Sequence, residues 1–212
     1  MNMLFILGSH NSLSYLPIKH WWKRYTAPWA RCQSLTLKQQ HNLGVSLFDI
    51  RVRIKNDSGI VFCHNTTVFK YSVEQFYKDL IELHGTIMLR FILDERKRPN
   101  NAAKHKQIFL DFVQKTCKYM DDRVILTEAR VFWEWKDYAS DLCKLTDDRI
   151  SSMQIVLHEI YSSVSRTFFK LLPPKWFASV FNKQLNGLFF IERKNHALFD
   201  NHCIMLDYVE KI

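Results

Sequence analysis

Three apolar stretches of the chain lead into residues that can move a proton or hold a phosphate. His10 follows a run that ends in Gly-Ser, His64 ends the run Val-Phe-Cys, and Asp49 and Arg51 lie together in Phe-Asp-Ile-Arg. Cleavage of a phosphodiester by a neighbouring hydroxyl needs a base, an acid and a fixed positive charge. Imidazole suits the first two roles because its ordinary pKa lies near neutrality. Arginine suits the third because its planar fork matches phosphate.

The segment 47–53 is typical of a β-strand, in which successive side chains point to opposite faces. Asp49 is therefore placed to orient Arg51 or a neighbouring histidine. The polar and apolar side chains separate completely, with Asp49, Arg51 and Arg53 on one face and Phe48, Ile50 and Val52 on the other.

With these residues the chain resembles the X-domain of phosphatidylinositol-specific phospholipase C in its metal-independent bacterial form. The resemblance covers residues 4–94 and the last ten residues, and the stretch 121–187 does not align. Four segments carry it: Gly-Ser-His-Asn-Ser at 8–12, Gln40 and Gly44 followed by Phe-Asp-Ile-Arg at 48–51, Ile-Val-Phe-Cys-His at 60–64, and Ile-Met-Leu-Asp-Tyr-Val at 204–209.

The resemblance implies a role for each of five residues. His10 is the general base, His64 the general acid and Arg51 the phosphate clamp. Asp207 orients His10, and Asp49 supports the side of the site that holds Arg51 and His64. A single histidine at a strand end is more often structural than catalytic, and an aspartate near a chain end is common. The resemblance therefore carries these roles.

The question of a metal depends on Asn11 and Arg51. Bacterial members have an aspartate after the first histidine, whereas Asn11 matches the calcium-dependent enzymes and cannot stabilise an imidazolium by charge. Calcium-dependent relatives carry an acid-x-acid pair on the second strand, which supplies the oxygen ligands that hard cations need. Here Arg51 replaces the second acid, and its charge would repel a cation. We expect metal-independent chemistry and no cofactor.

The resemblance also indicates contacts to the substrate head group. Candidates are Asn11, then Arg90 and Asp94 on one face of the strand at 86–93, and Asp137 with Tyr138 further along. A buried ion pair would explain Arg90 and Asp94 equally well. Core packing is the simpler explanation for Asp137 and Tyr138.

The order of apolar runs predicts a (β/α)₈ TIM-type barrel, an α/β fold that is small here and irregular in its second half. The sequence has no linker, so residues 1–212 are expected to form a single domain. Strands are expected at 4–7, 45–52, 59–63, 86–93, 124–127, 155–158, 188–191 and 203–206, and helices at 33–42, 72–83, 102–120 and 163–184.

The net charge of +9 and pI of about 9.3 indicate an acidic partner. Trp21, Trp22 and Lys23 follow the first strand in a segment similar to the short helix that bacterial members press into membranes. Tryptophan among basic residues is typical of an interfacial binder, and it would also suit stacking on single-stranded nucleic acid. The resemblance favours a phospholipid surface, and no nucleic acid is expected. The aromatic and basic stretch 168–183 is expected to pack on the barrel.

Localisation follows from what the sequence lacks. No apolar run reaches the roughly 20 residues of a membrane span. The first seven residues have neither a basic start nor a cleavage site, so no signal peptide is evident. The 5 cysteines include no Cys-x-x-Cys pair and predict neither a disulfide framework nor a zinc site. A cytoplasmic protein that binds peripherally to a membrane surface is expected.

The predicted activity is that of a phosphoric diester hydrolase or lyase of the phospholipase C type. It would convert phosphatidylinositol to diacylglycerol and a cyclic inositol phosphate. Two alternatives stay open: a phosphodiesterase for another head group, such as a glycerophosphodiester, and a catalytically weak module that binds phosphoinositides. The sequence gives neither the phosphorylation state of the head group nor the oligomeric state.

Overall fold

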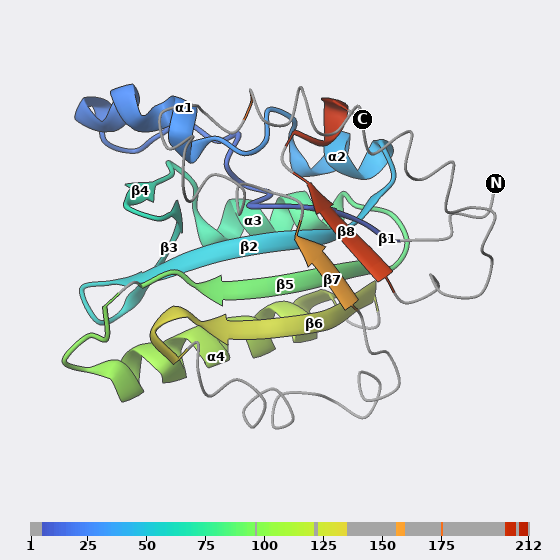
Figure 1. Ribbon diagram of the computed structural model, residues 1–212. Coiled ribbons are helices and arrows are strands. Elements are labelled where there is room, and N and C mark those ends of the chain that lie inside the picture. The colour runs from blue at the N-terminus through green and yellow to red at the C-terminus, as the bar shows by residue number, and fades with distance from the viewer. Residues whose placement is uncertain are drawn as a thin grey trace.

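The computed structural model describes residues 6–95, 97–120, 123–134, 156–159, 175, 202–206 and 208–211 (Figure 1). These residues form a mixed α/β fold built on one sheet. In chain order the strands are β1 (Ile6–Ser9), β2 (Val45–Lys55), β3 (Gly59–His64), β4 (Thr67–Val68), β5 (Ile87–Leu93), β6 (Val124–Val131), β7 (Val156–Glu159) and β8 (His202–Leu206). The helices are η1 (Trp21–Thr26), α1 (Ala27–Ala30), α2 (Leu37–Asn42), α3 (Val73–Ile81), α4 (Ala102–Met120), η3 (Phe132–Glu134) and η5 (Val209–Lys211).

Six of the strands run parallel, in the order β7, β8, β1, β2, β5, β6 (Figure 1). The first strand of the chain thus lies between the second strand and the last one, which is the neighbour order that a barrel requires. Among the described strands, β6 and β7 do not pair with each other, so the described part of the sheet is open. The predicted α/β architecture is confirmed, and the closed eight-stranded barrel stays a prediction.

The strand predicted at 59–63 is present as β3, but it is not one of the parallel strands. It pairs antiparallel with the end of β2, from Val52 opposite Phe62 to Lys55 opposite Gly59. The reason is the length of the connection: a parallel crossover needs a dozen or more residues, whereas a short turn suffices for a hairpin. Asn56 and Asp57 make that turn with φ of 51° and 53°. β4 then extends the hairpin on its outer side.

The core lies between the apolar face of the sheet and the helices α3 and α4. Phe48, Ile50 and Val52 of β2 are fully buried in it, so the predicted alternation of β2 is confirmed. Phe76 of α3 packs on Phe112 of α4, with ring centroids 6.1 Å apart. Burial of these large side chains is the main force that holds the helices on the sheet.

The helix predictions are confirmed where the structure describes them. The predicted bounds of α4 match, and α3 begins after Ser72, whose hydroxyl accepts the N–H of Gln75. α2 begins four residues later than predicted because Thr36 and Gln39 form a capping box. The strand predicted at 188–191 lies outside the described residues, as does the helix predicted at 163–184 apart from residue 175. Among the described helices, none is long and apolar enough to cross a membrane.

Candidate active site

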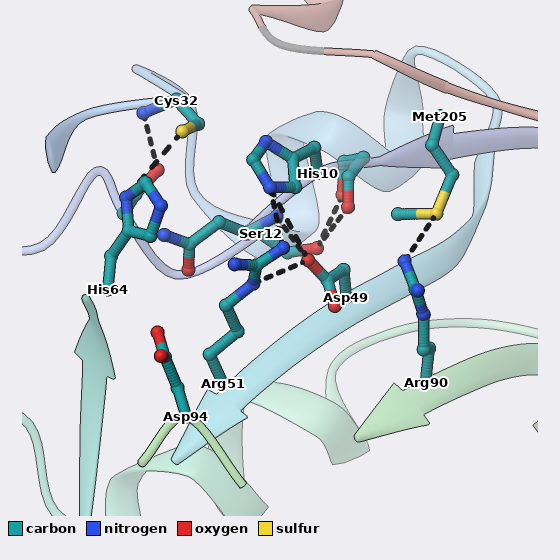
Figure 2. Close-up of polar contacts among 12 residues, drawn as sticks. His10, Ser12, Cys32, Asp49, Arg51, His64, Arg90, Asp94 and Met205 are labelled. Carbon is teal, nitrogen blue, oxygen red and sulfur yellow. Dashed lines mark hydrogen bonds and ion pairs between the residues drawn. The ribbon is translucent and has the colours of Figure 1, made fainter. Parts of the chain in front are cut away.

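The two histidines meet at the carboxyl ends of β1 and β3. His10 follows β1 directly, and His64 is the last residue of β3. Their rings lie edge to face with centroids 5.8 Å apart, and both side chains are buried (Figure 2). The strand ends therefore bring together two imidazoles that are far apart in the sequence.

Arg51 lies against both His10 and Asp49. Its Nη2 donates to Nε2 of His10 at 2.7 Å, and its Nε donates to Oδ2 of Asp49 at 3.0 Å (Figure 2). The same carboxylate oxygen accepts the backbone N–H of Asn11 at 3.0 Å and lies 3.9 Å from Nε2 of His10. Because a guanidinium only donates, Nε2 of His10 must carry its lone pair toward Arg51. The ring nitrogen that a base would use thus faces the predicted phosphate clamp.

Asp49 is a fully buried carboxylate that stays ionised. Burial alone would raise its pKa, but the charges of Arg51 and Arg90 and the N–H of Asn11 outweigh it. The pKa of Asp49 is therefore held well below its usual range. The expected placement of Asp49 beside Arg51 is confirmed by this geometry, and its other neighbour is His10 rather than His64.

His64, in contrast to Asp49, is held in its uncharged form. Burial lowers the pKa of His64 to about 4, and the positive charge of Arg51 acts in the same direction. Its Nδ1–H donates to the carbonyl of Ala30 at 2.8 Å, which fixes the ring. In the free protein the imidazole of His64 is therefore neutral at pH 7.

Each histidine is followed by an asparagine in the left-handed region. Asn11 has φ of 46° and Asn65 has φ of 52°. The backbone N–H of Asn65 donates to Oδ2 of Asp94 at 2.7 Å, just as that of Asn11 donates to Asp49. Asparagine adopts this conformation more readily than most residues. Each turn therefore attaches a histidine to a buried aspartate, which is Asp49 in the neighbouring strand β2 for His10 and Asp94, directly after β5, for His64.

The end of β1 is also tied to the end of β8. The N–H of His10 donates to the carbonyl of Leu206 at 2.9 Å. The side chain of Gln33 donates to the carbonyls of His10 and Leu206, and its oxygen accepts the N–H of Val209. Asp207, the predicted partner of His10, lies outside the described residues. Asp137 and Tyr138 also lie outside them.

Of the predicted head-group residues, Arg90 and Asp94 are both buried in the sheet. Arg90 donates from Nε to Glu128 at 2.6 Å, and its Nη1 lies 3.6 Å from Sδ of Met205. The expected buried ion pair therefore exists, but its acid is Glu128 of β6 instead of Asp94. Glu128 was missed because the predicted strand ended at residue 127, although Glu128 and Arg130 continue the alternation.

The tryptophan segment forms an exposed rim beside the histidines. Trp21 is 72% exposed and Trp22 53% exposed, as expected of residues that contact a surface. Lys23 donates from Nζ to the carbonyl of Thr66 at 2.7 Å, and its contact with a membrane stays a prediction. This bond and the bridge between residues 18 and 69 attach the rim to the hairpin that carries His64.

No family model matches the sequence, and no curated protein matches it. Solved structures do. Phosphatidylinositol-specific phospholipase C from Listeria monocytogenes superposes with a TM-score of 0.63 at 16% identity, over 97% of this chain and 88% of that one. A double mutant of the Staphylococcus aureus enzyme gives 0.64 at 16% identity, over 96% and 84%. Another structure of that enzyme, described as modulation of its membrane binding, gives 0.61 at 17%, over 96% and 85%.

The chain has the fold of these phospholipases. The resemblance inferred from four short segments is thus confirmed at the level of the fold. Most of the length of each neighbour is covered.

Two neighbours of His64 carried no signal in the sequence. The carbonyl of Ala30 holds His64, and Sγ of Cys32 lies 3.8 Å from Nδ1 of the same ring. Ala30 is the last residue of α1. Cys32 lies between α1 and α2, in a segment whose position is fixed by distant residues. The N–H of Cys32 donates to Ser14 at 2.8 Å, and its carbonyl accepts the N–H of Tyr208 at 2.6 Å.

Proposed function

We propose that the protein cleaves the head group of a phospholipid as a phosphodiesterase, with phosphatidylinositol as the first substrate to test. The observation that carries the proposal is the meeting of two buried histidines with a guanidinium that Asp49 holds in place. The shared fold with bacterial phosphatidylinositol-specific phospholipases C supports the choice of substrate.

In the proposed reaction the inositol 2-hydroxyl attacks the adjacent phosphorus. Nε2 of His10 takes the hydroxyl proton, and the bond from phosphorus to the glycerol oxygen breaks. His64 protonates that oxygen, so the products are diacylglycerol and a cyclic inositol phosphate. Asp207 is proposed to support His10, as the third member of a triad does. The neighbours of Asp207 in the chain, Leu206 and Tyr208, belong to the same end of the sheet as His10.

Substrate binding must change two features of the free site. Arg51 now donates to Nε2 of His10, so it has to turn toward the phosphoryl oxygens before that nitrogen can act as a base. His64 is neutral in the free protein and must gain a proton to act as an acid. A bound phosphodiester supplies both changes, because its negative charge attracts Arg51 and raises the pKa of His64.

Metal-independent turnover forms part of the proposal. Arg51 occupies the strand position where calcium-dependent relatives carry an acid, and its charge is suited to the phosphoryl oxygens. The amide of Asn11 and Oδ1 of Asp94 are buried without a hydrogen-bond partner among the described residues. We assign them to substrate hydroxyls. The rim around Trp21 and Trp22 is proposed to contact the lipid surface.

The test is an incubation with vesicles of single phospholipids in the presence of a chelator. Products are identified by mass spectrometry, and His10→Ala is the control. We expect a cyclic inositol phosphate from phosphatidylinositol. His10→Ala should form it about 10²–10⁴-fold more slowly than the wild type. If the protein cleaves only another head group, it is a phosphodiesterase with a different substrate. Vesicle binding without any product would refute the enzymatic proposal and favour a lipid-binding module.

A further inference from the structure

Three groups that zinc prefers as ligands meet in the site. One ring nitrogen each of His10 and His64 and Sγ of Cys32 lie within 4.8 Å of one another. Ligand atoms around a tetrahedral zinc ion, bound at about 2.0–2.1 Å by nitrogen and about 2.3 Å by sulfur, lie roughly 3.4–3.6 Å apart. The observed separations need to shrink by only about 1 Å. Side-chain rotation alone could achieve this.

The three residues are held in place by their surroundings. Hydrogen bonds to Ser14 and Tyr208 fix the backbone of Cys32 on both sides. Nδ1 of His64 donates to the carbonyl of Ala30, and a partner of this kind orients a metal ligand and raises its affinity. Nε2 of His10 accepts from Arg51, so the guanidinium has to turn away before a metal can bind this nitrogen. Cys32 and His64 are thus held in place, and Arg51 is the group that zinc must displace.

Both imidazoles can offer a lone pair, and zinc binds neutral imidazole. Because Nδ1 of His64 donates to Ala30, the lone pair of this ring lies on Nε2. The thiol of Cys32 would lose its proton to solvent when the metal binds. Cys63, the sequence neighbour of His64, is not among the residues whose ligand atoms converge.

The donor set selects a soft ion. It contains two imidazoles and one sulfur but no carboxylate, and such sites suit zinc and exclude magnesium and calcium. Among the described residues, the carboxylate of Asp49 lies 3.9 Å from Nε2 of His10 and is already bonded to Arg51. The positive charge of Arg51 lowers the affinity for any cation, and the thiolate offsets it.

We propose that His10, Cys32 and His64 form a zinc site that inhibits the protein. A zinc ion bound there would take up the nitrogen lone pairs of both histidines, so that neither could move a proton. The binding half of this inference stands alone, whereas the inhibition rests on the proposed phosphodiesterase function. The site differs from a catalytic cofactor site, because turnover proceeds only after the zinc has left.

Binding is tested first, on the metal-free protein, with cobalt(II) as a spectroscopic probe. We expect one equivalent to give a thiolate-to-cobalt charge-transfer band and the visible bands of a tetrahedral site, both removed by zinc. Cys32→Ser should lose the charge-transfer band and bind zinc at least about 100-fold more weakly. Cys117→Ser is the control, because this half-buried thiol on α4 lies outside the cluster.

Two results would overturn the binding site. One is a charge-transfer band that survives in Cys32→Ser, and the other is no zinc binding by the wild type at 1 mM. If Cys32→Ser does not fold, as judged by near-ultraviolet circular dichroism, X-ray absorption of the zinc-loaded wild type decides. One sulfur and two imidazoles in the coordination shell support the site, and any other set of protein ligands refutes it.

Inhibition is tested next, on cleavage of a short-chain phosphatidylinositol. Zinc should inhibit the wild type and a chelator should restore it. Cys32→Ser, measured against its own activity without zinc, should need at least about 100-fold more zinc than the wild type for the same fractional inhibition. Equal sensitivity of both proteins would refute the assignment. A protein that binds zinc but cleaves no lipid would contradict only the proposed function, whereas an active protein that ignores zinc would contradict only this inference.

Discussion

The buried imidazole of His64 should make the protein sensitive to acid. The pKa of His64 is about 4 in the folded protein, against about 6.5 for an unperturbed histidine. The unfolded chain therefore binds the proton more readily, so protonation favours unfolding. The stability that the neutral ring contributes is present above pH 6.5 and is lost as the pH falls toward 4. Between pH 7 and pH 5 the loss is about 2 kcal/mol, at 1.36 kcal/mol per pH unit.

The assay is urea unfolding at pH 7 and pH 5, followed by tryptophan fluorescence. We compare the wild type with His64→Asn, whose amide nitrogen can replace Nδ1 as the donor to Ala30 but cannot titrate. The wild type should lose about 2 kcal/mol more than the variant between the two pH values. Exposed His84→Asn is the matched control and should behave as the wild type does. Equal losses for wild type and His64→Asn would refute the idea that His64 is held neutral.

Three further outcomes are expected. Arg51→Lys keeps the charge but loses the fork that contacts Asp49 and His10, so turnover of a soluble substrate should fall about 10²-fold or more; unchanged turnover would mean that charge alone suffices. Asp49→Asn leaves buried positive charge uncompensated and should lower the free energy of unfolding by about 3–5 kcal/mol in urea titrations, and a loss below about 1 kcal/mol would contradict the assigned balance. The double variant Trp21→Ala/Trp22→Ala should bind anionic vesicles at least about tenfold more weakly while cleaving a soluble short-chain substrate at the wild-type rate. Equal losses of vesicle binding and of turnover on the soluble substrate would mean that the tryptophans support the fold instead.

Local rules predicted much of this molecule. The alternation along β2 gave the correct face for Asp49 and Arg51, and helical spacing gave the bounds of α4. Both patterns arise within one element, where the side-chain period is set by the backbone alone. The strand ends then placed His10 and His64 at one site.

The remaining contacts depend on how elements meet, which a local pattern does not contain. Arg90 lies opposite Glu128 because the register between β5 and β6 shifts just before it. Cys32 reaches His64 because Ser14 and Tyr208 fix its irregular segment from two sides. The β3 hairpin was misassigned to the parallel set, since an apolar run reads the same in either direction and only the short turn distinguishes them.

Asn11 and Asn65, which follow the two histidines with a left-handed backbone conformation, limit the substitutions that these positions can accept. A β-branched residue at position 11 or 65 would be strained by the backbone itself, whatever its side chain could contribute to chemistry. Glycine and aspartate fit the same backbone. In a library of random variants selected for folding, both positions should therefore accept glycine, asparagine and aspartate and reject valine and isoleucine. The dipeptide after each apolar run would then outlast the rest of the sequence as a mark of common descent, since the shape of the turn restricts its second residue in addition to any contact with substrate.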